Sequence, residues 1–157
     1  FKEKILDLFL STFETKIDSK DRVSIPARFR SLLERKNEDL ILFTSPGDNF
    51  IQGCGNQYIE RLWEANLNLD QFSKEALYIQ DILSDSIQFK LDSEGRINLT
   101  SKLIQHANLS NKVLFSGRGE TFQIWEPNLF FKEKQNRINK MKGSKPQSLL
   151  LGNRNNK

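Results

Sequence analysis

Residues that commonly support catalysis or bind metal are scarce in this 157-residue chain, which has one cysteine, one histidine and one methionine. The single cysteine, Cys54, cannot form an intrachain disulfide, which is consistent with a reducing compartment such as the cytosol. Cys54 and His106 together cannot supply the ligands of a structural zinc site. No serine and aspartate motif supports a catalytic triad around His106. We therefore expect no enzymatic activity, no cofactor, no metal and no small-molecule substrate.

Long hydrophobic runs are also missing. The apolar stretches are far shorter than the roughly 20 residues that a membrane-spanning helix needs. The first ten residues, FKEKILDLFL, contain acidic side chains and lack a small-residue cleavage site, so no signal peptide is predicted. Hydrophobic residues make up 37% of the chain, which is enough to bury a core. We expect a globular cytoplasmic protein with no membrane partner.

The clearest pattern in the chain is a short motif that occurs twice. The first copy, KIDSKDRVSIP, begins at Lys16, and the second, KLDSEGRINLT, begins at Lys90, an offset of 74 positions. A match at a fixed offset predicts two related halves. Apolar and polar residues alternate before and after each Asp-Ser pair, which predicts a strand, a polar turn and a second strand in each copy. Gly95 suits the positive φ that such a turn can need, whereas Asp21 adopts it less easily.

Each copy places an aspartate four residues before an arginine. Asp18 precedes Arg22, and Asp92 precedes Arg96. An aspartate can accept hydrogen bonds from turn N–H groups or from the guanidinium, and either contact would hold the arginine at the turn. A purely structural ion pair explains one copy equally well. Duplication does not remove that explanation, because a structural device duplicates as readily as a binding site.

The segments after each motif follow the same order in both halves. A helix, a buried strand, a turn and a returning strand are predicted after each copy. Two helices are predicted between the halves, with Phe72 on the apolar face of the second. Both tryptophans, Trp63 and Trp125, are interpreted as core residues. The predicted strands lie at 40–43, 50–52, 113–115 and 121–125. Three helices are predicted to start at Pro26, Thr100 and Pro127, and the two helices between the halves are predicted within 56–84.

Basic residues gather at the two turns. Lys16, Lys20 and Arg22 belong to the first copy, and Lys90 and Arg96 belong to the second. The net charge of +4 permits a polyanionic partner without requiring one. Arginine can bind guanine with two hydrogen bonds, lysine can neutralise phosphate, and strands with their turns can enter the major groove of DNA. A solvated charged surface is the alternative interpretation.

Three stretches resemble the MraZ family of regulators of the bacterial division and cell-wall gene cluster. They are DSKDRVSIPARFR from Asp18, DSEGRI from Asp92 and FQIWE from Phe122, and the likeness covers about residues 9–140. The resemblance implies an α+β, mainly β fold. In that fold, two tandem swapped-hairpin AbrB-like halves form a pseudo-dimeric barrel with flanking helices. Together with the composition and the helical periodicity, the resemblance predicts an N-terminal extension at 1–8, a first half at 9–55, a helical connector at 56–85, a second half with a C-terminal helix at 86–142 and a flexible tail at 143–157.

The resemblance also implies a function. Family members are expected to be sequence-specific, nucleoid-associated DNA-binding transcription regulators. They are expected to form ring homo-oligomers on repeated promoter boxes in double-stranded DNA and to regulate their own operon. Carried over by motif, the DNA-contacting residues are Lys20, Arg22 and Arg96, and Asp18 and Asp92 brace the turns. To these we add Lys16 and Lys90 as predicted phosphate contacts.

One departure from the family pattern supports a second hypothesis. Asp21 stands where the family usually has glycine, which places an acid beside Arg22. The alternative function is therefore an oligomeric protein-interaction module of the same fold with weak or lost DNA binding. An enzyme is the third alternative, and it lacks any supporting residue pair.

Overall fold

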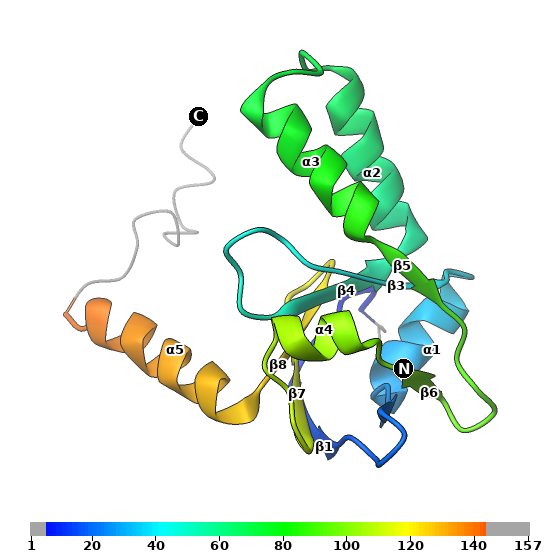
Figure 1. Cartoon of the computed structure of the whole chain (residues 1–157), viewed down its shortest axis with the longest axis vertical. Coiled ribbons are helices and arrows are strands. Elements are labelled where there is room, and N and C mark those ends of the chain that lie inside the picture. Colours follow the sequence, from blue (N-terminus) through cyan, green and yellow to red (C-terminus); the bar gives the residue numbers. More distant parts are fainter. Residues whose placement is uncertain (1–5, 144–157) are drawn as a thin grey trace, which may run out of the picture. The chain divides into compact units, whose positions relative to one another are not determined.

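The computed structural model describes residues 6–143, and this part of the chain contains eight strands and five helices (Figure 1). The described residues belong to two units, Phe1–Pro127 and Asn128–Lys157, and the second contains only helix α5. The predicted tail after Gly143 lies outside the described residues. The strands are β1 (Thr12–Lys16), β2 (Arg22–Ser24), β3 (Leu40–Phe43), β4 (Ile51–Gly55), β5 (Ile87–Phe89), β6 (Arg96–Asn98), β7 (Lys112–Gly117) and β8 (Phe122–Trp125). The helices are α1 (Ala27–Arg35), α2 (Asn56–Leu67), α3 (Lys74–Asp85), α4 (Ser101–His106) and α5 (Pro127–Lys140).

The strands form one six-stranded sheet and one separate two-stranded ribbon. The sheet has the order β1-β7-β8-β4-β3-β5 and the ribbon pairs β2 with β6, with every pair antiparallel. This is a mixed α and β architecture in which the named strands pair in antiparallel fashion. Within the described residues the outer strands β1 and β5 do not pair with each other, so the sheet stays open. The barrel expected from the resemblance is therefore not closed.

Strands from the two copies of the motif pair with the opposite half of the chain. Strand β1 of the first half pairs with β7 of the second, and β5 of the second half pairs with β3 of the first. The two strands beside each turn do not form a ladder with one another. Instead β2 pairs with β6, because this brings Val23 opposite Ile97 and buries both side chains. Each turn is thus anchored in a ribbon that contains both copies.

The main core lies beneath the ribbon and joins the two halves. Ile25 and Leu99 directly follow the ribbon strands and are buried with Val23 and Ile97. Helix α1 begins at Ala27, one residue after Pro26, and places Phe29 in the middle of this core. Burial of each such side chain contributes roughly 1.5–3 kcal/mol, so the core fixes the ribbon on the domain. In the second half Thr100 caps α4 by accepting a hydrogen bond from the Leu103 N–H, as predicted.

Strand β3 is buried on both faces. Leu40 and Leu42 belong to the main core, whereas Ile41 and Phe43 contact the base of the hairpin formed by α2 and α3. Beyond its base the hairpin is less covered than the sequence predicts. Trp63 is half exposed, so its assignment to the core is wrong, whereas Trp125 is buried as predicted.

The prediction for Phe72 is also wrong, because this residue precedes α3 and is exposed. Helical periodicity identified an apolar face on the hairpin but could not show whether this chain covers it.

Candidate functional site

The outer face of the β2–β6 ribbon presents polar side chains from both copies of the motif. Because side chains alternate along a strand and Val23 and Ile97 point into the core, the residues on either side of them point outward. Arg22 lies opposite Asn98, and Ser24 lies opposite Arg96. The two arginines are therefore diagonal neighbours on one face of the ribbon. Their side chains are 33% and 26% exposed, so both can reach a ligand.

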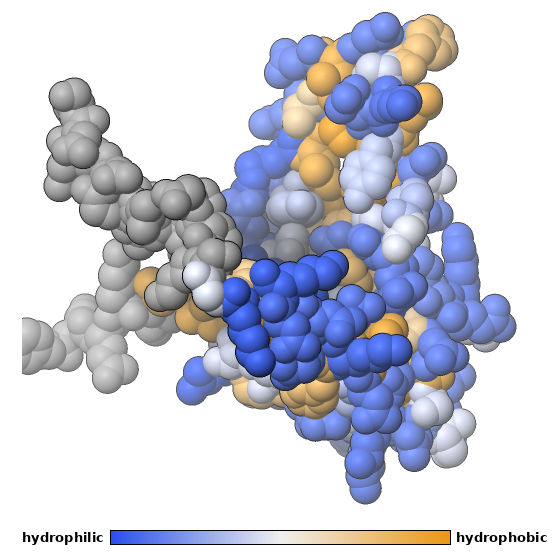
Figure 2. All heavy atoms as spheres, turned by 90° about the vertical axis from the view of Figure 1, so that its left-hand side faces the viewer, coloured by the Kyte–Doolittle hydropathy of each residue, from blue (hydrophilic) through white to orange (hydrophobic). Residues whose placement is uncertain are grey.

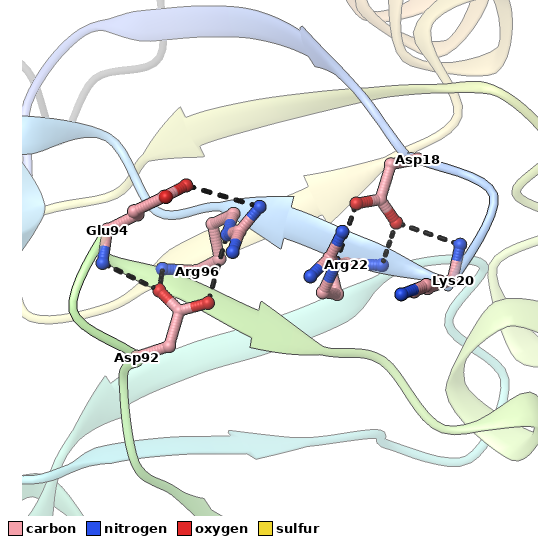
Figure 3. A network of polar contacts seen from close by, with 6 residues as sticks. All are labelled: Asp18, Lys20, Arg22, Asp92, Glu94 and Arg96. Carbon is pink, nitrogen blue, oxygen red and sulfur yellow. Dashed lines mark hydrogen bonds and ion pairs between the residues drawn. The ribbon is translucent and has the colours of Figure 1, made fainter.

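The first turn is held by Asp18 (Figure 3). Its Oδ1 accepts hydrogen bonds from the backbone N–H groups of Lys20 and Arg22, each at 2.9 Å. Its Oδ2 accepts a bond of 2.7 Å from Arg22 Nε. The guanidinium is thereby fixed through Nε. The two terminal nitrogens of Arg22 make no ion pair with another residue in 6–143, so they are available to a ligand.

The second turn repeats this arrangement almost atom for atom. Asp92 Oδ1 accepts from the backbone N–H groups of Glu94 and Arg96, and Asp92 Oδ2 accepts from Arg96 Nε, all at 2.9 Å. One contact has no counterpart in the first turn. Arg96 Nη1 forms an ion pair of 3.2 Å with Glu94, which occupies one of its terminal nitrogens (Figure 3).

The pKa shifts of Asp18, Asp92 and Arg96 all favour the charged forms of these side chains. The backbone N–H of Arg22 lowers the pKa of Asp18, and the backbone N–H of Arg96 lowers the pKa of Asp92. The hydrogen bond to Asp92 raises the pKa of Arg96. Both aspartates are therefore ionised at neutral pH and can hold the two guanidinium groups in a fixed geometry.

A residue with positive φ closes each turn. Gly95 has φ +76° and Asp21, at the same place in the first copy, has φ +60°. The Gly95 carbonyl accepts from Ile25 N–H, and the Asp21 carbonyl accepts from Leu99 N–H, so each turn also ties the other half's strand. At Gly95 a Cβ atom would lie 2.4 Å from a terminal nitrogen of Arg30. Glycine suits this place because its backbone adopts positive φ without strain, and a larger residue would also have to displace the Arg30 side chain.

The surroundings of the two turns differ in charge. Lys16 lies directly opposite Lys112 on β7, an arrangement of like charges that costs stability unless an anion binds. Lys90 instead lines a depression together with three acidic residues, Glu34, Glu38 and Asp39. The first motif contains three basic and two acidic residues, whereas the second contains two of each. The first turn is therefore the more cationic of the two.

The seven residues predicted from the sequence lie in or beside the two turns. Three further polar residues lie next to them and were not predicted. Ser24 and Asn98 share the outer face of the ribbon with the arginines, and the alternation of the motif could have identified them. Lys112 lies far from the motif in sequence, and only the pairing of β1 with β7 brings it beside Lys16. The remaining predicted residues, Lys20 and Lys90, are exposed.

The two residues considered for catalysis lie in surroundings that do not activate them. Burial raises the pKa of the Cys54 thiol to about 12, so it is not a thiolate at neutral pH. His106 Nε2 is buried without a hydrogen-bond partner among the residues that the structure describes. No helix within this part of the chain has both the length and the apolar character needed to cross a bilayer.

Comparison with known proteins gives a consistent result. A family model described as "MraZ protein, putative antitoxin-like" matches residues 82–151. A protein named Transcriptional regulator MraZ from Pelagibacter ubique (strain HTCC1062) is 45% identical over 131 residues, which are 82% of this chain and 84% of the relative. Proteins of the same name from Rickettsia bellii (strain OSU 85-389) and Rickettsia canadensis (strain McKiel) are 37% identical over 128 residues and 35% identical over 129 residues. These matches cover 80% and 81% of this chain, and 85% and 87% of the relatives.

Proposed function

The chain belongs to the MraZ family of transcriptional regulators, and from that premise we propose that its β2–β6 ribbon binds double-stranded DNA in a sequence-specific way. Membership of a regulator family also implies a role other than catalysis. The observation that carries the proposal is the shared outer face of Arg22 and Arg96. Two arginines that come from different halves of the chain are diagonal neighbours on one face, and each is held by its own aspartate.

The dimensions and chemistry of the ribbon suit the major groove. B-DNA admits a two-stranded ribbon there, and a guanidinium can donate two hydrogen bonds to guanine O6 and N7. Arg22 has both terminal nitrogens available for this contact within the described structure. Asn98, directly opposite, can bind adenine through its amide. The aspartates hold the arginine side chains through Nε, so less conformational entropy is lost when DNA binds.

Phosphate contacts would come from the lysines around the turns. Lys20 lies in the first turn, and Lys16 and Lys90 lie at the strand ends that lead into the two turns. None of the three forms an ion pair within residues 6–143. Each phosphate that a lysine neutralises releases counterions, so such contacts raise affinity and make it depend on salt. Asp21 and Glu94 would reduce this attraction.

We further propose the assembly and the regulatory role that the family resemblance implies. The exchange of strands between the halves supports two swapped-hairpin AbrB-like units in one chain. A ring of copies in the nucleoid would present many ribbons to repeated boxes in the promoter of the division and cell-wall gene cluster. Binding several boxes at once would raise affinity without new contacts, which suits autoregulation of that operon.

Binding of the promoter DNA upstream of the chain's own gene tests this function. Arg22→Ala and Arg96→Ala combined should lower affinity by at least about 30-fold, because each bidentate base contact is worth roughly 1–3 kcal/mol. Arg61→Ala, which changes an exposed arginine of helix α2, is the matched control and should leave affinity unchanged. Full-strength binding by the double variant would contradict the site.

A protein-interaction module without DNA binding is the second candidate. The acidic residues Asp21 and Glu94 favour it, and the ion pair between Glu94 and Arg96 would then be purely structural. Salt distinguishes the two functions. Affinity that falls steeply with salt supports phosphate contacts, whereas no affinity even at low salt supports the interaction module.

A further inference from the structure

The α2–α3 hairpin is poorly covered for a pair of amphipathic helices. Each helix has 12 residues, yet Asn66 is the buried residue of α2, and Ala76 and Ile82 are those of α3. Contacts with the sheet are confined to its base, where Tyr58 and Leu62 lie near Ile82. Helices of this length are marginal without packing of an apolar face. The hairpin therefore leaves apolar surface that a partner could cover.

Large apolar side chains are exposed along this hairpin. The most exposed are Phe72, at 77%, and Leu67, at 63%. Figure 2 shows hydrophobic surface over the hairpin, between hydrophilic patches. A cluster of this kind, edged by polar residues, is typical of a protein interaction site. We call the exposed large apolar residues of the hairpin the hairpin face; they are Trp63, Leu67, Leu69, Phe72, Leu77 and Tyr78.

A second apolar surface lies beside helix α1. It is a groove of about 440 Å³ whose lining includes three exposed leucines of the N-terminal segment, Leu6, Leu8 and Leu10. Arg28 and Arg35 also line it, and among residues 6–143 no acidic side chain does. Arg35 contacts Asp7 at 3.2 Å, whereas Arg28 forms no ion pair within residues 6–143. We call this surface the α1 groove.

Charge selects between the possible partners of the hairpin face. Residues 56–85 carry six acidic and two basic side chains, a net charge of −4, although the whole chain has a net charge of +4. Two hairpins packed face to face would bring these negative charges together. The α1 groove combines apolar side chains with two arginines, so it complements the hairpin face in both respects.

We propose that the hairpin face of one copy docks into the α1 groove of the next copy. Because the two surfaces lie on different elements, the contact is head-to-tail, and repeated head-to-tail contacts close into a ring or extend as a filament. This inference rests on the self-assembly proposed above and assigns the surfaces that produce it. It is independent of the ribbon that is proposed to bind DNA.

Cysteine cross-linking tests the contact directly. Cys54 is buried and is the chain's sole cysteine, so an introduced surface cysteine is the accessible thiol. We would mix equal amounts of a Phe72→Cys variant and an affinity-tagged Leu8→Cys variant and add a short bis-maleimide. The expected product is a covalent dimer that contains one copy of each variant. Ser110→Cys, an exposed position outside both surfaces, is the control and should give no product with either partner.

Two outcomes of this experiment would overturn the inference. Cross-linking of Phe72→Cys to itself would show a symmetric contact between hairpins. An oligomer without any cross-link between positions 8 and 72 would place the contact elsewhere.

A second measurement separates this inference from DNA binding. Leu67→Glu and Phe72→Glu combined should reduce the mass in solution from oligomer to monomer, while circular dichroism stays unchanged, because both side chains are exposed. Affinity for DNA with one box should stay within about threefold, and the gain from repeated boxes should disappear. An unchanged oligomer mass would contradict the proposed contact, whatever the DNA result. If Arg22 and Arg96 variants assemble normally but no longer bind DNA with one box, the result tests the DNA-binding ribbon and leaves the proposed contact between copies unaffected.

Discussion

The first turn, at Asp18–Arg22, and the second, at Asp92–Arg96, share a backbone but differ in what surrounds their arginines. In both, one carboxylate binds two backbone N–H groups and the arginine Nε. Arg96 has an additional ion pair with Glu94, whereas Lys20 stands at the equivalent place in the first turn. The geometry of an arginine and its availability to a ligand are thus set by different residues. The two copies share the arginine geometry and differ in the availability of the arginine to a ligand.

Single substitutions of the two arginines should have the largest effect. Arg22→Ala should weaken DNA binding by about 10- to 100-fold, because its terminal nitrogens are available and its turn is more cationic. Arg96→Ala should weaken it less, since Glu94 already holds one terminal nitrogen. Fluorescence anisotropy at a fixed salt concentration measures both. Equal losses would show that the difference in surroundings has no consequence for binding.

The closing residues of the turns should respond in opposite ways to substitution. Gly95→Ala should destabilise the fold by about 1–3 kcal/mol, because it combines a positive φ with a contact against Arg30. Asp21→Gly should raise stability by less than about 1 kcal/mol, because a non-glycine residue leaves the left-handed region. Urea denaturation measures both changes. A stable Gly95→Ala variant would show that the second turn tolerates rearrangement.

Exchanging one charge should make the two turns more alike. Glu94→Lys removes the ion pair to Arg96 and places a lysine where the first turn has Lys20. We expect higher affinity for DNA and a steeper dependence of log affinity on log salt, by about 0.9 for one new phosphate contact. Lys20→Glu is the reciprocal change and should reduce the slope by a similar amount. Unchanged slopes in both variants would place the turns away from the phosphates.

The smallest expected effect is that of pH on stability, because it appears only at acidic pH. The pKa values of Asp18 and Asp92 are lowered in the folded protein, chiefly by the backbone N–H groups of Arg22 and Arg96. Their contribution to stability is therefore complete above the unfolded carboxylate pKa of about 3.9 and is lost as the pH falls through the lower folded values. Asp18→Asn, combined with Asp92→Asn, should flatten the stability profile below about pH 4. An unchanged acid profile would contradict the bracing role.

The sequence predicted the turns well because their interactions are local. An aspartate four residues before an arginine can form the observed brace with little help from the rest of the chain. Pairing of β2 with β6 was not predicted, because three-residue strands carry little information about their partners. The outward positions of Ser24 and Asn98, and the neighbour Lys112, depend on such long-range pairing. Trp63 was misassigned because helical periodicity does not distinguish a face covered by the same chain from one left for a partner.

The most direct test of the proposed DNA site is a photo-cross-link from the centre of the ribbon. A photoreactive amino acid placed at Ser24, on the exposed face opposite Arg96, should cross-link to duplex promoter DNA. The same amino acid at Glu60, on the exposed part of helix α2, should not cross-link above background. DNA cross-linked from position 60 and not from position 24 would contradict the account.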